Sequence, residues 1–300
     1  MFCNADYYDE ELINLLFEQG VDINNKLGVE DIYLSFIEFA PENIAIKLLE
    51  KVTNVNEKLV CEIWHHPDSA SDLKEPTMVY DSYLNLAIQK NKPQLALALI
   101  KSGAVNFKSP LLVSVMYSSM QINDKLALFE LLIEKGLDVN GGASSWEKPL
   151  MQVIDSSMQS TDKLAILELL IEKGLDINCG ATNYYENPLM QVLCNSLMQI
   201  NDKIALWKFL IAKEKEDDLN VINNANGNIM WQQLSSAATW NKDKVNDYNE
   251  LAKLLLTSGK LKLSEEEKSS DYYKYIEKMI KIESDITWLS SREVINLNYG

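Results

Sequence analysis

The sequence predicts an all-α protein built from repeated helix–loop–helix units. Residues 131–140 read LLIEKGLDVN and residues 169–178 read LLIEKGLDIN, which makes Gly136 and Gly174 equivalent at an offset of 38 residues. The apolar residues before each glycine recur with helical spacing and spread around much of the helix, as in helices buried on more than one side by stacking. Weaker copies of this ending lie on either side, so the chain has room for about seven units.

Each ending is predicted to close the second helix of its unit. Gly174 is expected to adopt the left-handed conformation that stops a helix, because glycine has no Cβ to clash in that conformation. At the start of the same helix, Asp162 is expected to be the N-cap residue, accepting a hydrogen bond from an unpaired backbone N–H. Asp124 and Asp202 occupy the matching places in the neighbouring units.

A proline is predicted to open the first helix of three units, at Pro110, Pro149 and Pro188. Proline suits the first helical position because the N–H that it lacks would have no partner there. Ser109 and Asn187 directly precede two of these prolines and are expected to act as caps. The units are therefore predicted to run helix, loop, helix, glycine and then a short extended segment.

The unit resembles an ankyrin repeat. That family has repeats of about 33 residues with a TPLH start, two helices, an LLL-x-x-GA ending and a following DVN. The segment SYLNLAIQKNKPQLALALIKSGAVN at 82–106 fits this length without gaps, and Ala87 lies where the family has a small residue. The resemblance covers roughly residues 8–263 and implies a solenoid specialised for protein–protein recognition.

The proline-led units depart from the family pattern in two ways. They lack the TPLH histidine, and Met116, Met151 and Met190 fall nearby. They also contain extra residues in SSMQINDK, SSMQSTDK and SLMQINDK, which we expect to form an added turn of the first helix and a longer loop. The methionines are expected to fill the core rather than to form an adaptable binding surface.

Two segments lie outside the repeats and complete the predicted organisation. The chain is expected to comprise repeats at 1–56, an inserted loop or short helix at 57–81, repeats at 82–263 and a C-terminal helical cap at 264–300. In the cap, Ser264 and Glu267 have capping-box spacing. Five apolar or aromatic residues then form a helical stripe, namely Tyr272, Tyr273, Ile276, Met279 and Ile280.

The charge of the chain narrows the class of partner. The net charge is −16, and Arg292 is the only arginine among 28 basic residues. Nucleic-acid binding needs a positive surface and favours arginine, so a nucleic-acid partner is not expected. An acidic surface speeds association with a basic one, which favours a basic protein partner, although negative charge also serves solubility alone.

The sequence also favours a soluble cytoplasmic protein. No run approaches ~18 apolar residues, so no membrane partner is expected. The N-terminus lacks the basic and apolar regions of a secretory signal. The four cysteines form no CxxC pair, which favours a reducing compartment.

Catalysis, metal binding and cofactor binding are not expected. His65 and His66 are the only histidines, and with Cys61 and Glu62 they include residue types that bind metals. Adjacent histidines on a helix point in different directions, so a shared metal site is not expected. An ordinary loop is the favoured interpretation. No nucleophile elbow or glycine-rich phosphate loop is present.

The candidate binding residues lie in the fingers between units and on the first helices. The fingers GGASSWEK (141–148) and CGATNYYEN (179–187) carry aromatic side chains, which are favoured binding anchors but which equally suit packing on an adjacent finger. The predicted partner-binding residues are Trp146, Tyr184, Tyr185, Gln152, Asp155, Gln191, Asn195 and, in the insertion, Trp64.

Three functional hypotheses follow. The first is a non-enzymatic scaffold that captures a basic protein, for example as an intracellular inhibitor of the immunity or antitoxin type. The second is a host-directed effector of a host-associated microbe that docks on a host protein through a neutral or apolar surface. The third is an enzyme that uses residues 57–81, supported only by the two histidines.

Overall fold

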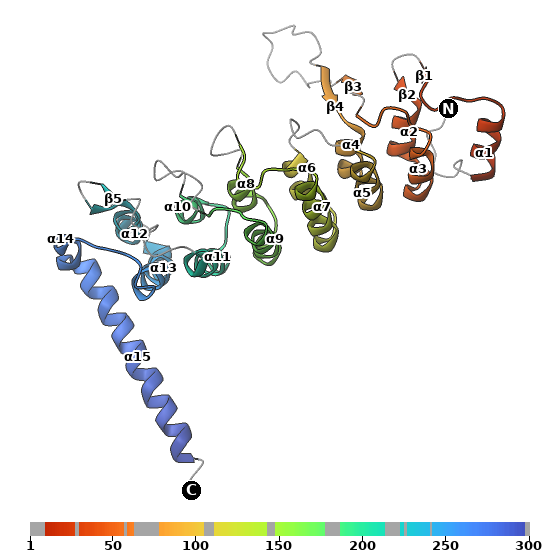
Figure 1. Cartoon of the computed structure of the whole chain (residues 1–300). Helices are drawn as coiled ribbons and strands as arrows, with labels where there is room; N and C mark the ends of the chain where they lie inside the picture. The colour runs from red at the N-terminus through yellow and green to blue at the C-terminus, as the bar shows by residue number, and fades with distance from the viewer. Residues whose placement is uncertain are drawn as a thin grey trace. The chain divides into compact units, whose positions relative to one another are not determined.

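The computed structural model describes residues 10–27, 30–56, 59–62, 78–104, 111–142, 148–177, 187–213, 223–224, 227–240 and 242–297. These residues are predominantly helical, which confirms the all-α class (Figure 1). They belong to two compact units, one of residues 1–141 with 156–158 and the other of residues 142–155 with 159–300. The expected segments 1–56, 57–81, 82–263 and 264–300 stay a prediction.

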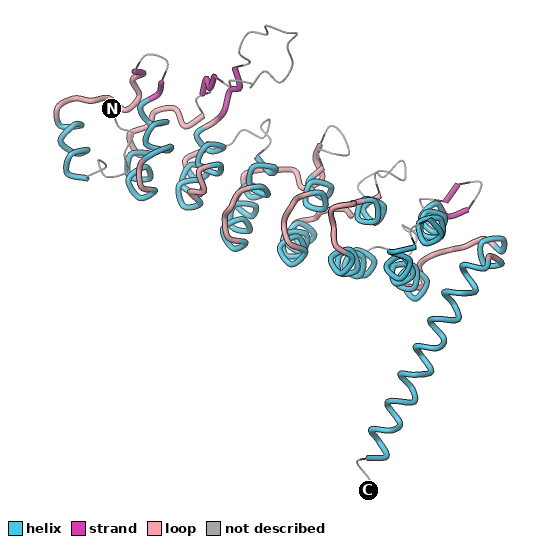
Figure 2. Tube along the Cα trace, turned by 180° about the vertical axis from the view of Figure 1, so that it is seen from behind, coloured by secondary structure: helices cyan, strands magenta, loops and turns pink. Residues whose placement is uncertain are grey.

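The first unit is built from helix pairs. Its helices are α1 (Glu10–Glu18), α2 (Ile32–Phe39), α3 (Glu42–Leu49), α4 (Tyr83–Gln89), α5 (Pro93–Lys101), α6 (Leu111–Tyr117) and α7 (Ile122–Glu134). The first helices α2, α4 and α6 contact one another in order, and the second helices α3, α5 and α7 do the same. The pairs therefore lie side by side as two rows (Figures 1 and 2).

The second unit repeats this arrangement and adds a terminal helix. It contains α8 (Pro149–Asp155), α9 (Ser160–Glu172), α10 (Pro188–Cys194), α11 (Ile200–Lys213), α12 (Ile229–Trp240), the 3-10 turn η5 (Lys242–Lys244), α13 (Val245–Thr257), α14 (Glu265–Ser269) and α15 (Asp271–Leu297). Helix α8 contacts α10, and α9, α11 and α13 form the second row. Helix α15 packs on α13 and α14.

Short antiparallel ladders accompany the helices. They are β1 (Lys26–Leu27) with β2 (Glu30–Asp31), β3 (Leu59–Glu62) with β4 (Met78–Asp81), and β5 (Asn223–Asn224) with β6 (Gly227–Asn228). The ends of the insertion thus pair as strands, so the expected loop or short helix at 57–81 is corrected there. Val60 lies opposite Tyr80 and Cys61 opposite Val79, and such β-branched and aromatic residues favour strands.

The extra residues of the proline-led units extend the second helix, not the first. Helices α8 and α10 have seven residues, the same as α4, whereas α9 has 13 and α5 has nine. The expectation of a longer first helix was therefore wrong. Asp162 is not the N-cap either, because α9 begins at Ser160 with Gln159 as its cap residue. Asp162 instead lies in the first turn, where its negative charge interacts favourably with the positive end of the helix dipole.

The predicted glycine stop is confirmed. Gly174 has a φ of +97°, and its N–H donates to the Ile171 carbonyl at 3.0 Å. The Leu175 N–H donates to the Leu170 carbonyl at 2.8 Å, which completes a Schellman motif. The cap at Asn187 is also confirmed, since its Oδ1 accepts hydrogen bonds from the two backbone N–H groups at the start of α10.

A lysine joins the two helices of each proline-led pair. The Nζ atom of Lys163 donates to the Ile154 carbonyl at 2.6 Å, Lys125 donates to Met116 at 2.9 Å and Lys203 donates to Leu193 at 2.8 Å. Lys125 and Lys163 are buried. Each ammonium satisfies a carbonyl near the end of a first helix, one that has no partner within the helix. The repeated DK dipeptide therefore serves the fold.

The asparagine that ends the repeated decapeptide motif has a structural role between pairs. In the first unit, Asn24 Nδ2 donates to the Lys51 carbonyl at 3.0 Å, and its Oδ1 accepts from the Thr53 N–H at 2.9 Å. Asn56 Nδ2 likewise donates to the Gly103 carbonyl at 2.9 Å. Each asparagine thus binds the end of the next second helix and fixes the spacing of the pairs.

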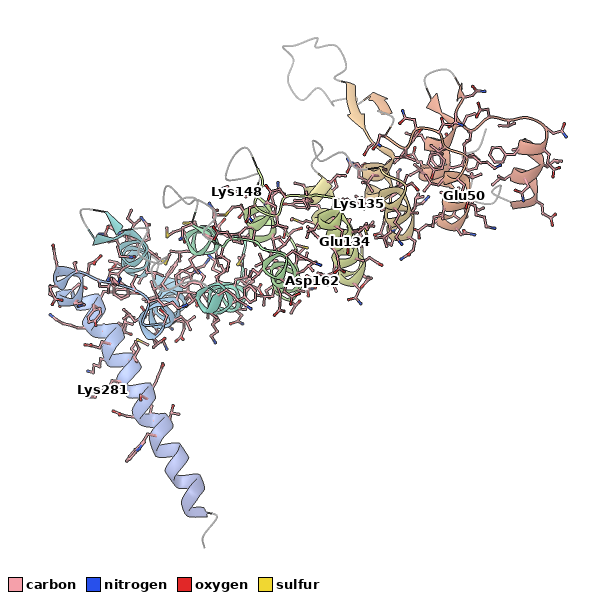
Figure 3. All side chains as sticks on the ribbon, in the orientation of Figure 1. Glu50, Glu134, Lys135, Lys148, Asp162 and Lys281 are labelled. Atoms are coloured by element: carbon pink, nitrogen blue, oxygen red, sulfur yellow. The ribbon has the colours of Figure 1, made fainter. Side chains whose placement is uncertain are left out.

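The side chains between the helices form a continuous apolar core in each unit. Figure 3 shows them filling the space between the rows, while Glu134 and Lys135 at the end of α7 face outward. Met116, Met151 and Met190 are 1–2% exposed, which confirms that they fill the core.

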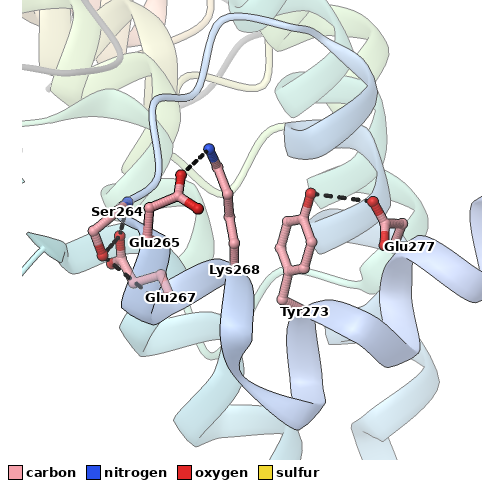
Figure 4. Close-up of polar contacts among 6 residues, drawn as sticks. All are labelled: Ser264, Glu265, Glu267, Lys268, Tyr273 and Glu277. Atoms are coloured by element: carbon pink, nitrogen blue, oxygen red, sulfur yellow. Dashed lines mark hydrogen bonds and ion pairs between the residues drawn. The ribbon is translucent and has the colours of Figure 1, made fainter.

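Helix α14 attaches the terminal helix to the last pair. The capping box predicted at Ser264 and Glu267 is confirmed, with the Glu267 carboxylate accepting from the Ser264 N–H at 2.8 Å (Figure 4). Its second oxygen accepts from the Asn228 N–H at 2.6 Å. Tyr272 and Tyr273 pack against Trp231 of α12, with ring centroids 5.4 and 6.0 Å away.

Candidate functional site

The aromatic candidates from the fingers and the insertion lie outside the described residues. These are Trp146, Tyr184, Tyr185 and Trp64. The four polar candidates are described, and all belong to the second unit. Gln152 and Asp155 lie on α8, Gln191 lies on α10, and Asn195 is the C-cap residue of α10.

The structure brings Asp155 and Asn195 together. The Asn195 amide hydrogen-bonds the Asp155 carboxylate, and its Oδ1 accepts from the N–H groups of Leu197 and Met198 at 3.1 Å. Asn195 therefore shapes the loop after α10 as well as facing the candidate surface. Counted from the prolines, Cys194 is the equivalent of Asp155, since each is the seventh and last residue of its helix.

Asp155 has an unusual environment for an exposed residue. Its carboxyl group lies among protein atoms, and this desolvation raises its pKa, although the positive charge of Lys163 and the Asn195 hydrogen bond lower it. Desolvation also lowers the pKa of Lys163, against the attraction of Asp155 and Asp202. The ionised carboxylate is thus less favourable in the fold than in water.

Gln152 and Gln191 occupy equivalent positions, the fourth residue of α8 and of α10. Both are half-buried. The Oε1 atom of Gln152 is buried and has no hydrogen-bond partner within the described chain. A buried acceptor of this kind is costly unless another group or a water molecule supplies a donor.

A row of exposed residues was missed by the sequence analysis. The last residue of every described first helix is exposed, namely Phe39, Gln89 and Tyr117 in the first unit and Asp155, Cys194 and Trp240 in the second. We call the three such residues of each unit its helix-end row. Tyr117 is 59% exposed and Trp240 is 83% exposed, which is unusual for large aromatic side chains.

The residues of the helix-end rows all lie at the end of a first helix, but their side chains differ in size, polarity and charge. In the first unit α2, α4 and α6 pack in order, so that Phe39, Gln89 and Tyr117 end neighbouring helices. Counting seven residues from Pro149 and Pro188 would have found Asp155 and Cys194, but the same count from Pro110 reaches buried Met116, one residue before Tyr117. Phe39 and Trp240 gave no such signal, because their helices do not begin with proline.

The described residues offer no group of three or more histidine, cysteine, aspartate or glutamate side chains that would hold a metal ion. His65 and His66 lie outside the described residues. None of the helices that the structure describes combines the length and apolar character needed to cross a membrane. The expectations about catalysis and cofactors stay predictions.

Comparison with protein-family models, with curated proteins and with solved structures found no match for this chain.

Proposed function

We propose that this protein is a non-enzymatic scaffold that binds a basic protein partner through the first-helix side of an ankyrin-like stack of about seven repeats. The observation that carries the proposal is the helix-end row. Six first helices, three in each unit, end in an exposed residue, and these six residues all differ. A constant frame with one variable exposed row is the arrangement expected of a recognition surface.

The distribution of charge supports a basic partner. Lys125 and Lys163 are buried against backbone carbonyls, so two positive charges are withdrawn from the solvent-facing surface. Exposed carboxylates meanwhile recur at equivalent positions of α7 and α9, namely Glu130, Glu134, Glu168 and Glu172. The described surface is therefore more acidic than the residue count suggests. These carboxylates lie on second helices, so they favour a basic protein through the long-range field that accelerates encounter, and not as contacts on the first-helix side.

Affinity capture at two salt concentrations tests this proposal. The protein is used to capture partners from the lysate of its own source at low and at high salt, and bound proteins are identified by mass spectrometry. We expect a basic protein to bind at low salt and to bind much less at high salt. An acidic partner, or binding that ignores ionic strength, would refute the basic-partner proposal.

Substitutions in the helix-end row locate the surface. Tyr117→Ala and Trp240→Ala remove exposed rings, so we expect little loss of fold stability but at least about tenfold weaker partner binding if the rings are anchors. Trp288→Ala on α15 is the matched control, since its side chain is 54% exposed and lies outside the row. Unchanged binding in both row variants would exclude the row as the contact surface.

An inhibitor of the immunity or antitoxin type, acting in the cytoplasm, is the form of this function that best fits an acidic binding protein. The exposed rings of Tyr117 and Trp240 favour a second candidate, a host-directed effector with a partly apolar contact surface. Capture of the same partner from a host lysate but never from the producing cell would select the effector.

A further inference from the structure

We infer that helix α15 pairs with α15 of a second copy of this chain, in antiparallel orientation, and that the protein forms a two-fold dimer through this contact. The pairing is independent of the proposed partner binding. It involves a surface on α15 that we call the α15 seam, made of Tyr275, Met279, Ile282 and Ile286.

The α15 seam is exposed although it is apolar. Tyr275, Ile282 and Ile286 are 50%, 47% and 56% exposed, and Met279 is half-buried. A neighbouring face of the helix is the one that packs on the body, through buried Ile276 and through Glu283, which accepts a hydrogen bond from Lys253 of α13 at 2.5 Å. The seam therefore lies beside the packed face and not on it.

Beyond the contact of Glu283 with Lys253, the helix extends away from the other helices of its unit (Figures 1 and 2). Every residue from 281 to 288 is exposed. The sequence of 282–297 contains three serines, one threonine and four β-branched aliphatic residues, which are poor helix formers. A helix of this composition is marginal without tertiary packing, so it needs a covering surface.

The spacing of the seam selects another helix as that surface. Tyr275, Met279, Ile282 and Ile286 are separated by four, three and four residues, which is the spacing of the apolar positions in a coiled coil. In an antiparallel pair, Met279 of one copy lies at the level of Ile282 of the other, and Tyr275 lies at the level of Ile286. The seam is thus complementary to itself.

The charge of α15 favours a second copy of this chain, and not a basic protein, as the partner of this helix. Helix α15 has five acidic and four basic residues, so it is nearly neutral in a chain of net charge −16. Lys274, Lys278 and Lys281 lie toward its start, and Glu283 and Asp285 follow them. Glu277 also lies among the lysines, so residues 274–281 have a net charge of +2 and residues 282–286 a net charge of −2. Antiparallel pairing sets these two segments against each other.

One charge pair beside the seam defines the orientation. Lys278 and Asp285 are both exposed and occupy the same heptad position, directly before Met279 and Ile286. In the antiparallel pair, Lys278 of each copy faces Asp285 of the other, so the contact occurs twice. This arrangement also leaves the two bodies at opposite ends of the paired helices, as a closed two-fold dimer allows.

Mass measurement tests the dimer. Sedimentation velocity of the full chain, over a wide range of concentration and at low and high salt, should show a species of twice 34.1 kDa that persists at high salt. Ile282→Glu should shift the protein to monomer, and Ser284→Glu, the same charge on the opposite side of the helix, should not. A parent chain that is monomeric throughout, or equal dimerisation of the two variants, overturns the inference.

A charge exchange tests the orientation. Lys278→Asp and Asp285→Lys each create two repulsive contacts, so each should weaken dimerisation by about tenfold. The double variant should recover to within about twofold of the parent, with unchanged circular dichroism in all three. Failure of the double variant to recover overturns antiparallel pairing. Because basic-partner capture should decrease with salt and the dimer should not, failure of one leaves the other to be judged separately.

Discussion

Lys163 gives the sharpest test of how the helix pairs are held together. Its ammonium is buried, with the residue 4% exposed, and it donates to the Ile154 carbonyl at 2.6 Å. Lys163→Met keeps most of the volume and the apolar stem but removes the donor and the charge. The Ile154 carbonyl, near the end of α8, then has no donor from this side chain.

The expected loss follows from two opposing contributions. A hydrogen bond from a charged donor stabilises by about 1.5–3 kcal/mol. Removing the buried ammonium also removes its desolvation cost, which is appreciable because burial lowers the pKa of Lys163 despite two nearby carboxylates. We therefore expect a net destabilisation of about 1–2 kcal/mol, or roughly 2–8 °C in thermal midpoint for a unit of this size.

Urea unfolding followed by far-UV circular dichroism measures this change. Lys208→Met is the matched control, because Lys208 is exposed on α11 and the substitution removes the same charge. We expect the control to stay within about 0.5 kcal/mol of the parent. If Lys163→Met were as stable as Lys208→Met, the buried lysine would not be what joins the helices of its pair.

Three further outcomes are expected. Gly174→Ala should cost about 1–2 kcal/mol in thermal unfolding from left-handed strain alone, because no atom lies within 4 Å of the added Cβ, and Gly174→Asn should cost less. Asp155→Asn should raise the urea midpoint at pH 7, since the raised pKa means that the folded state binds more protons just above pH 3.8, and the gain should vanish below that pH. Ser264→Ala should cost about 1 kcal/mol and speed amide exchange at Glu267.

The features that could be predicted from sequence are those in which one residue type has one dominant use. Gly174 ends a helix because a left-handed residue is needed there, and Asn187 caps α10 because its side chain reaches the free N–H groups. The capping box at Ser264 and Glu267 depends on spacing within a single turn. Such signals are local, so tertiary contacts did not change them.

The features that were missed depend on contacts between elements. Asp162 was predicted to be the N-cap of α9. The helix instead begins two residues earlier, at Ser160, within the extra residues of the proline-led unit. A lysine normally faces water, and nothing local shows that Lys163 turns inward to a carbonyl nine residues earlier. The helix-end row becomes visible only once the helices are aligned by structure, because Trp240 belongs to a unit with little sequence similarity to the others.

The two proposed surfaces should respond differently to salt concentration, because their charges differ. The repeats bury lysines and expose carboxylates, so contacts on the helix-end row should weaken as salt screens the attraction to a basic partner. Helix α15 is nearly neutral and its seam is apolar, so salt should leave its pairing intact. A protein that stays dimeric while releasing its partner at high salt would therefore place recognition on the repeats and self-association on α15. Simultaneous loss of both would mean that partner binding and α15 pairing use one shared surface.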